Sequence, residues 1–79
     1  MASIEKLLLK FLNNPSGIRY SELERLLLSL GFEKVWAKGS HVKFKHKLLQ
    51  RDLIIPVHGG DCKEFYKSYA AKIIKKFII

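Results

Sequence analysis

The spacing of the apolar residues changes twice along this chain, and the two changes limit the folds that it can adopt. From Ile4 to Leu30 apolar residues recur every three or four positions, which is typical of amphipathic helices. Between residues 40 and 46 they alternate with polar residues, as in a strand with one buried face. Helical spacing returns after Asp61. The sequence therefore predicts an α+β protein in which strands stand between helices.

Two helices are predicted before the strands. Residues 3–12 place five apolar side chains on one stripe: Ile4, Leu7, Leu8, Phe11 and Leu12. Residues 13–17 contain proline and glycine and break this helix. The second helix is expected to start at Ser21, because Ser21 and Glu24 have the spacing of a capping box. Gly31 is placed to end it in a left-handed C-cap.

Three strands and a last helix are predicted to follow. The strands cover residues 32–37, 40–46 and 53–58, with a turn at Lys38-Gly39 and a loop at residues 47–52. Pro56 cannot donate a ladder hydrogen bond, which indicates an edge strand. Asp61 is expected to cap the last helix, in which Phe65, Tyr69, Ile73 and Phe77 recur every fourth position. The order α-α-β-β-β-α fits a three-stranded antiparallel sheet with helices packed on one face, over residues 1–79 as a single domain.

The alternating strand places a histidine and two lysines on the face that the helices leave open. His41, Lys43 and Lys45 share that face, while Val42 and Phe44 point to the core. An antiparallel sheet can keep one face in water, so the three polar side chains are expected to be accessible.

The pairing of the second and third strands is predicted from the loop between them. If the residue numbers of paired residues in these two strands add to about 99, His41 lies beside His58 on the open face. A slip of two residues keeps the same faces, whereas a slip of one exposes the apolar set. His46 falls on the core side and is interpreted as a packing residue at the strand end. Trp36 and Phe32 are interpreted as core residues, although an exposed aromatic ring can stack on a base.

The charge of the chain is uneven. The net charge is +8, and residues 1–31 contribute +1 of it while residues 32–79 contribute +7. Such a basic surface is either simply solvated or attracts a polyanion, for which nucleic acid is the best candidate.

The sequence disfavours several other classes of protein. The single cysteine, Cys62, cannot form an internal disulfide, which indicates a reducing, cytoplasmic setting. No apolar run approaches the roughly 18 residues that span a bilayer, so no membrane partner is expected. No carboxylate cluster or Cys/His spacing suits a metal ion, so no metal and no other cofactor is expected.

Histidines and lysines on one open face are suited to cutting RNA. RNA carries its own nucleophile, the 2′-hydroxyl, so a base must remove its proton and an acid must protonate the leaving 5′ oxygen. Histidine suits both roles because its unperturbed pKa is about 6.5. His41 is the candidate catalytic residue and His58 a possible second one, although a surface histidine is more often not catalytic. The candidate RNA contacts are Lys38, Ser40, Lys43, Lys45, Lys47 and Arg51. Each of them can also be an ordinary solvated surface residue without a role in binding.

Four short motifs stand in a recognisable order: Leu26-Leu27, Leu30-Gly31-Phe32, Lys38-Gly39-Ser40-His41-Val42-Lys43-Phe44 and Ile55-Pro56-Val57-His58. In this order they resemble the HicA-type toxins of bacterial and archaeal toxin–antitoxin modules, over about residues 18–79. The resemblance implies a fold like that of a double-stranded-RNA-binding domain. It also implies a type II toxin that cleaves mRNA, with His41 as the catalytic histidine and a HicB-like antitoxin that covers this region. The helix at residues 3–12 precedes the part that resembles the family.

Three alternatives remain open from the sequence. One is an RNA-binding domain of the same fold that does not cleave. Another is a winged-helix DNA binder, which would need a third helix near residues 14–19, where Pro15 and Gly17 stand. Glu22 and Glu24 also lie on its would-be basic helix. The third is an interaction protein whose basic face docks an acidic partner.

Overall fold

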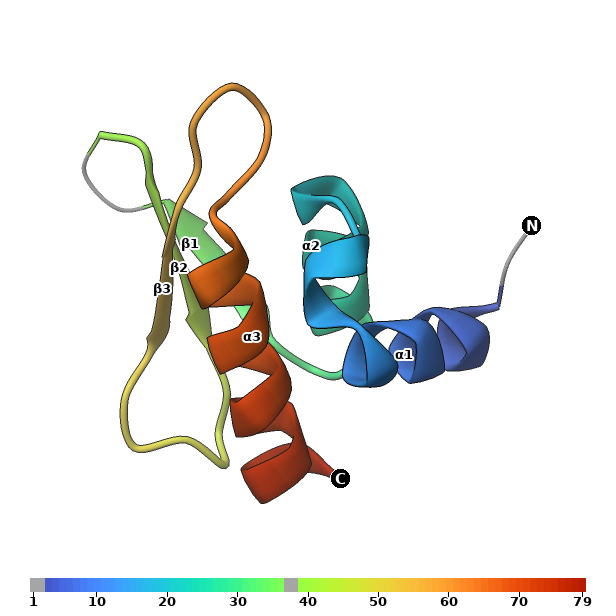
Figure 1. The fold of residues 1–79 in the computed structure, drawn as a ribbon. Helices are drawn as coiled ribbons and strands as arrows, with labels where there is room; N and C mark the ends of the chain where they lie inside the picture. Colours follow the sequence, from blue (N-terminus) through green and yellow to red (C-terminus); the bar gives the residue numbers. More distant parts are fainter. Residues whose placement is uncertain (1–2, 37–38) are drawn as a thin grey trace.

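A computed structural model of the chain describes residues 3–36 and 39–79. Its helices are α1 (Ile4–Asn13), α2 (Tyr20–Ser29) and α3 (Glu64–Ile73), with a 3-10 turn at Pro15–Gly17 and a π-helical turn at Ile74–Ile78. Its strands are β1 (Glu33–Trp36), β2 (His41–Lys45) and β3 (Leu53–Pro56). The helices all lie on one side of the sheet (Figure 1). The α+β class and the order α-α-β-β-β-α are confirmed, and the arrangement is like that of a double-stranded-RNA-binding domain.

The sheet is antiparallel with the order β1-β2-β3, so β3 is an edge strand, as Pro56 indicates. The predicted register is wrong by two residues: Val42 pairs with Ile55, and His41 pairs with Pro56 instead of His58. The reason lies in His46, which leaves the strand. Its Nε2 bonds the Leu30 carbonyl at 3.1 Å, and its Nδ1 accepts from the Leu48 N–H at 3.0 Å. The pairing of β2 with β3 therefore ends at Phe44 and Leu53, and each side chain stays on the face of the sheet predicted for it. His46 is confirmed as a packing residue.

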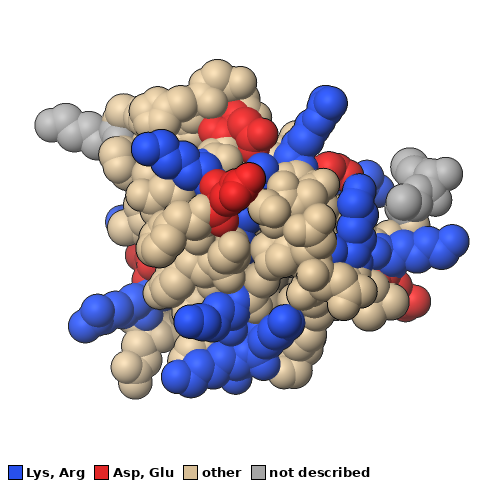
Figure 2. Space-filling view, in the orientation of Figure 1, with Lys and Arg blue, Asp and Glu red and all other residues tan. Residues whose placement is uncertain are grey.

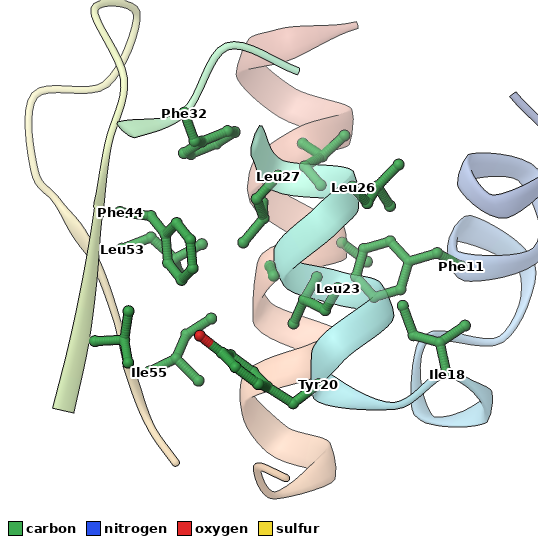
Figure 3. Close-up of a cluster of buried hydrophobic side chains, with 14 of the residues drawn as sticks. Phe11, Ile18, Tyr20, Leu23, Leu26, Leu27, Phe32, Phe44, Leu53 and Ile55 are labelled. Atoms are coloured by element: carbon green, nitrogen blue, oxygen red, sulfur yellow. The ribbon is translucent and has the colours of Figure 1, made fainter. Parts of the chain in front are cut away.

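The core lies between the sheet and the helices (Figure 3). The inner face of the sheet contributes four buried side chains: Val42, Phe44, Leu53 and Ile55. Leu27 of α2 points toward these side chains, whereas Leu26 points to the other side of α2, where Phe11 of α1 packs. Burying such side chains is worth about 1.5–3 kcal/mol each, so this core fixes which face of the sheet stays open.

The two ends of α2 agree with the prediction to different degrees. Gly31 has φ of +94°, and the Phe32 N–H donates to the Leu27 carbonyl at 3.1 Å, which confirms the left-handed C-cap. The predicted capping box is wrong, because the helix begins at Tyr20, one residue before Ser21. The Glu24 carboxylate instead accepts from the Tyr20 hydroxyl at 3.0 Å and pairs with Lys34.

The expected cap of the last helix is also wrong. Helix α3 begins at Glu64, and Asp61 caps α2 instead, where its Oδ1 accepts from the Tyr20 N–H at 3.1 Å. The same oxygen accepts from the Cys62 N–H at 2.8 Å and pairs with the buried Lys67 ammonium at 3.1 Å. The Cys62 hydrogen bond first, and then Lys67, hold the pKa of Asp61 below its ordinary value. Asp61 thus joins α2, α3 and the loop after β3.

Candidate functional site

His41 is the first residue of β2 and lies on the open face of the sheet. Burial alternates along this strand, with Val42 and Phe44 fully buried, Lys43 half-buried, and His41 and Lys45 exposed. The two buried side chains anchor the strand, so they fix the side on which His41 is presented. The predicted placement of His41, Lys43 and Lys45 on one accessible face is confirmed.

His41 lines an open hollow at this end of the sheet. Its other lining residues are Ser40, Pro56, His58, Lys63 and Tyr66. Four segments meet there: the start of β2, the end of β3, the loop after β3 and the start of α3. Although His58 is not opposite His41, the structure brings both imidazoles to the same hollow, as two proton-transfer groups acting on one phosphate would require.

The backbone around His58 is held by a tight turn. Gly59 and Gly60 both have positive φ, +60° and +80°, as the two central residues of a type I′ turn do. The His58 N–H donates to the Asp61 carbonyl at 2.8 Å, and the Asp61 N–H donates back at 3.1 Å. Since the Asp61 carboxylate is itself fixed on α2, the loop that carries His58 is anchored at both ends.

Sequence reasoning missed Lys63 and Tyr66 as members of this hollow. Lys63 is the N-cap residue of α3 and is exposed, while Tyr66 is half-buried in its first turn. The signal was the short connection after β3: a helix that starts so soon after the strand must begin beside the strand end. An ammonium group and a phenol ring therefore join the two histidines.

The lysines of the open face have acidic neighbours. The Lys43 ammonium lies 3.9 Å from the Asp52 carboxylate, and Lys45 is paired across the strands with Glu33. These two carboxylates reduce the local positive charge, so the basic character of this face is weaker than the lysines alone suggest.

The remaining candidate RNA contacts lie elsewhere or outside the described residues. Lys47 and Arg51 are exposed in the connection between β2 and β3, at the opposite end of the sheet from His41. Arg51 lines a different groove, which α3 also borders. Lys38 and the predicted Lys38-Gly39 turn fall partly outside the described residues, so the structure leaves Lys38 unplaced.

Trp36 is exposed, and its interpretation as a core residue is wrong, whereas Phe32 is buried as expected. Trp36 ends β1 opposite Val42 and is 69% exposed, with the Lys34 ammonium 4.5 Å from its ring centre. Because Trp36 is the partner of buried Val42, its side chain leaves the sheet on the helix side and not on the open face of His41, and the Lys34 ammonium beside it is also paired with Glu24 of α2.

The part of the chain that the structure describes offers neither a cluster of metal ligands nor a helix that spans a membrane. Within residues 3–36 and 39–79, no group of three or more His, Cys, Asp or Glu side chains is placed to hold a metal ion. In the same residues, no helix combines the length and the apolar character needed to cross a bilayer.

This chain matches the model of a known protein family. The family described as the HicA toxin of bacterial toxin–antitoxin systems matches residues 20–77, which include the whole sheet, α2 and α3. Helix α1 lies before the matched region. No curated protein and no solved structure matches the chain.

Proposed function

We propose, since this chain belongs to the HicA family of toxins from toxin–antitoxin modules, that it is an endoribonuclease that cleaves mRNA. Family membership makes the chain the toxin of such a pair and a HicB antitoxin its partner. The observation that carries the proposed activity is the hollow in which exposed His41 lies with His58, Lys63 and Tyr66. It combines two imidazoles, side chains that can each accept or donate a proton, with a cation for phosphate.

The proposed reaction uses the RNA's own 2′-hydroxyl. One imidazole removes its proton, the 2′ oxygen attacks phosphorus, and the bond from phosphorus to the 5′ oxygen breaks. The other imidazole donates a proton to the departing 5′ oxygen, leaving a 2′,3′-cyclic phosphate and a 5′-hydroxyl. We assign these roles to His41 and His58, and charge stabilisation to Lys63 with help from Lys43. No step needs a metal ion.

The ends of the products test this mechanism. Purified protein is expected to cleave RNA in excess EDTA and to leave 2′,3′-cyclic phosphate ends, detected by mass spectrometry. A single 2′-deoxy nucleotide at the cut site should block cleavage there, because it removes the nucleophile. Products with 5′-phosphate ends, or a requirement for added magnesium, would contradict the proposal. Binding without any cleavage would favour the non-catalytic RNA-binding alternative.

The structure gives less support to a winged-helix DNA binder. That fold needs a third helix in the region around residues 14–19, where the chain forms only the single 3-10 turn Pro15–Gly17. Glu22 and Glu24 also lie on α2, and Glu24 is engaged with Lys34 and Tyr20.

Replacing Lys43 and Lys45 together with glutamine is expected to weaken RNA binding and to flatten its salt dependence. Each lost phosphate contact makes the negative slope of log Kobs against log salt less steep by about 0.7 for single strands. We expect the slope of the double variant to be less steep by about 1. The full value for two contacts is not expected, because Asp52 and Glu33 already offset part of the charge. Fluorescence anisotropy with RNA at several salt concentrations measures this.

A matched control replaces Lys6 and Lys10 with glutamine. Both are exposed on α1, which packs against α2 away from the sheet (Figure 1). The net charge changes equally in the two double variants. An equal loss of slope in both would assign the effect to overall charge and would refute a phosphate contact on the open face.

A further inference from the structure

The outer face of α3 and of the π-helical turn Ile74–Ile78 that continues it is unusually apolar. Small residues, Ala70 and Ala71, pack toward the core, whereas Phe65, Tyr69 and Phe77 are 69%, 46% and 45% exposed. The Phe65 and Tyr69 rings stack at 6.4 Å between centroids with an interplanar angle of 6°. Scattered exposed apolar side chains need no explanation, but a contiguous set on one face is typical of an interaction surface.

A groove runs between this face and the connection from β2 to β3. Its apolar lining residues are Leu48, Leu49, Leu53, Tyr69, Ile73 and Phe77. Leu48 is more than half exposed, and Arg51 and Asp52 stand at the polar rim. The groove shares none of its lining with the hollow of His41, so it is a separate surface. We call it the α3 groove.

The surroundings of the α3 groove are basic. Lys72 and Lys76 are exposed three and seven residues after Tyr69, which places them on the same side of the helix. The Lys76 ammonium lies 5.4 Å from the centre of the Phe77 ring. Lys and Arg side chains gather over the C-terminal half of α3 in Figure 2. At the rim, Asp52 is already beside Lys43. The complementary ligand is apolar at its centre and acidic at its edges.

We propose that the α3 groove binds an acidic, amphipathic segment of the partner antitoxin, a proposal that rests on the toxin assignment above. Charge disfavours a second copy of this chain, because each copy carries +8. Four of the lining residues, Leu48, Leu49, Leu53 and Ile73, are aliphatic and offer neither donors for phosphate nor faces for stacking, which favours an apolar peptide surface over RNA; Tyr69, Phe77 and Arg51 could also contact RNA, so RNA binding is one outcome of the test. Apolar side chains one helical turn apart on the partner would enter the groove, and its carboxylates would meet Lys72 and Lys76.

This assignment separates affinity from inhibition. An antitoxin held in the α3 groove is anchored away from the catalytic hollow, and a second part of it remains available to cover His41. Substitutions in the groove should therefore weaken antitoxin binding and leave RNA cleavage by the free toxin intact.

The test measures, by calorimetry, the affinity of this protein for a purified HicB-type antitoxin. Phe77→Asp and Leu48→Asp each place a carboxylate in the groove, and each is expected to raise Kd roughly 30-fold or more. Leu9→Asp is the matched control, because Leu9 is an exposed leucine on α1 outside the groove. The milder Phe77→Ser and Leu48→Ser serve if an aspartate variant fails to fold, as judged by circular dichroism. All affinities are measured in a His41→Ala background, so cleavage does not interfere.

Each outcome decides the proposal. Reduced affinity in the groove variants with an unchanged Leu9→Asp control supports it. Unchanged affinity in folded groove variants, or no binding of the antitoxin by the parent protein, overturns it. Loss of RNA binding alone would assign the groove to RNA, and a dimer abolished by Phe77→Ser would assign it to a second copy; either result also overturns it. RNA cleavage by each variant with His41 restored, without antitoxin, tests the proposed enzyme activity separately.

Discussion

Replacing His41 with alanine is expected to abolish detectable RNA cleavage and to remove the toxicity of the expressed protein. General acid–base catalysis contributes roughly 10²–10⁴ to the rate, so loss of one imidazole should lower the single-turnover rate constant by that factor. The fold should survive, because His41 is exposed at the start of β2 and the neighbouring Val42 holds the strand in the core. Cleavage of a labelled RNA under single-turnover conditions gives the rate, and thermal melting confirms the fold.

His46 provides a matched comparison within the same strand region. Its ring bonds the Leu30 carbonyl and the Leu48 N–H, so His46→Ala should cost about 1–2 kcal/mol of folding free energy. The cleavage rate per folded molecule should stay close to that of the unaltered protein. His58→Ala should lower the rate without a comparable loss of stability. A folded His41→Ala protein with full activity would refute the assignment of His41.

The sequence was sufficient to place His41, because parity alone decides the face of a strand. Val42 and Phe44 had to be buried together, and this put His41, Lys43 and Lys45 on the other side. The register between β2 and β3 could not be predicted from the sequence. Registers in which the residue numbers of paired residues add to 97 or to 99 bury the same apolar side chains. The hydrogen bond between His46 and the Leu30 carbonyl, 16 residues earlier, decides between these two registers. Local periodicity contains no information on such a contact.

The same limit explains the errors at the helices. Ser21 and Glu24 have a local capping pattern, but the start of α2 is held by Glu22, whose carboxylate accepts from the Arg19 N–H, and by Asp61, which is 41 residues away from Tyr20. In α3 the sequence shows large apolar residues at every fourth position without deciding which side is buried, and the structure turns Ala70 and Ala71 to the core. Small side chains let the helix approach closely, so tertiary packing and not the size of the apolar residues decides which face is buried. The α3 groove follows from that choice.

Replacing Asp61 with alanine is expected to cost about 3 kcal/mol of folding free energy. The Lys67 side chain is only 6% exposed and pairs with Asp61 at 3.1 Å, so removal of the carboxylate leaves a buried charge without its partner. Breaking a buried ion pair usually costs about 3–5 kcal/mol of folding free energy. We expect a smaller cost for this pair, because the Asp61 side chain is 50% exposed and solvent screens its charge. Loss of the hydrogen bond from the Tyr20 N–H at the start of α2 adds about 1 kcal/mol. Urea unfolding at neutral pH measures the change.

The controls separate the charge from the cap. Asp61→Asn keeps an oxygen for the Tyr20 N–H and should lose less stability than alanine, while the double variant Asp61→Asn, Lys67→Met should recover most of the loss, because no buried charge remains. Equal destabilisation in the single and double asparagine variants would show that the ion pair is not responsible.

The pH dependence of stability gives an independent measurement of the same contact. Because the pKa of folded Asp61 is below the ordinary value of 3.8, its contribution is fully present above that pH and is lost as the pH falls through the folded value. The unaltered protein should therefore lose more stability in acid than Asp61→Asn does. The loop between Asp61 and β3 carries His58, so folded Asp61→Ala molecules should also cleave RNA more slowly. A cleavage rate per folded molecule equal to that of the unaltered protein would show that this anchor supports the fold and not the catalytic hollow.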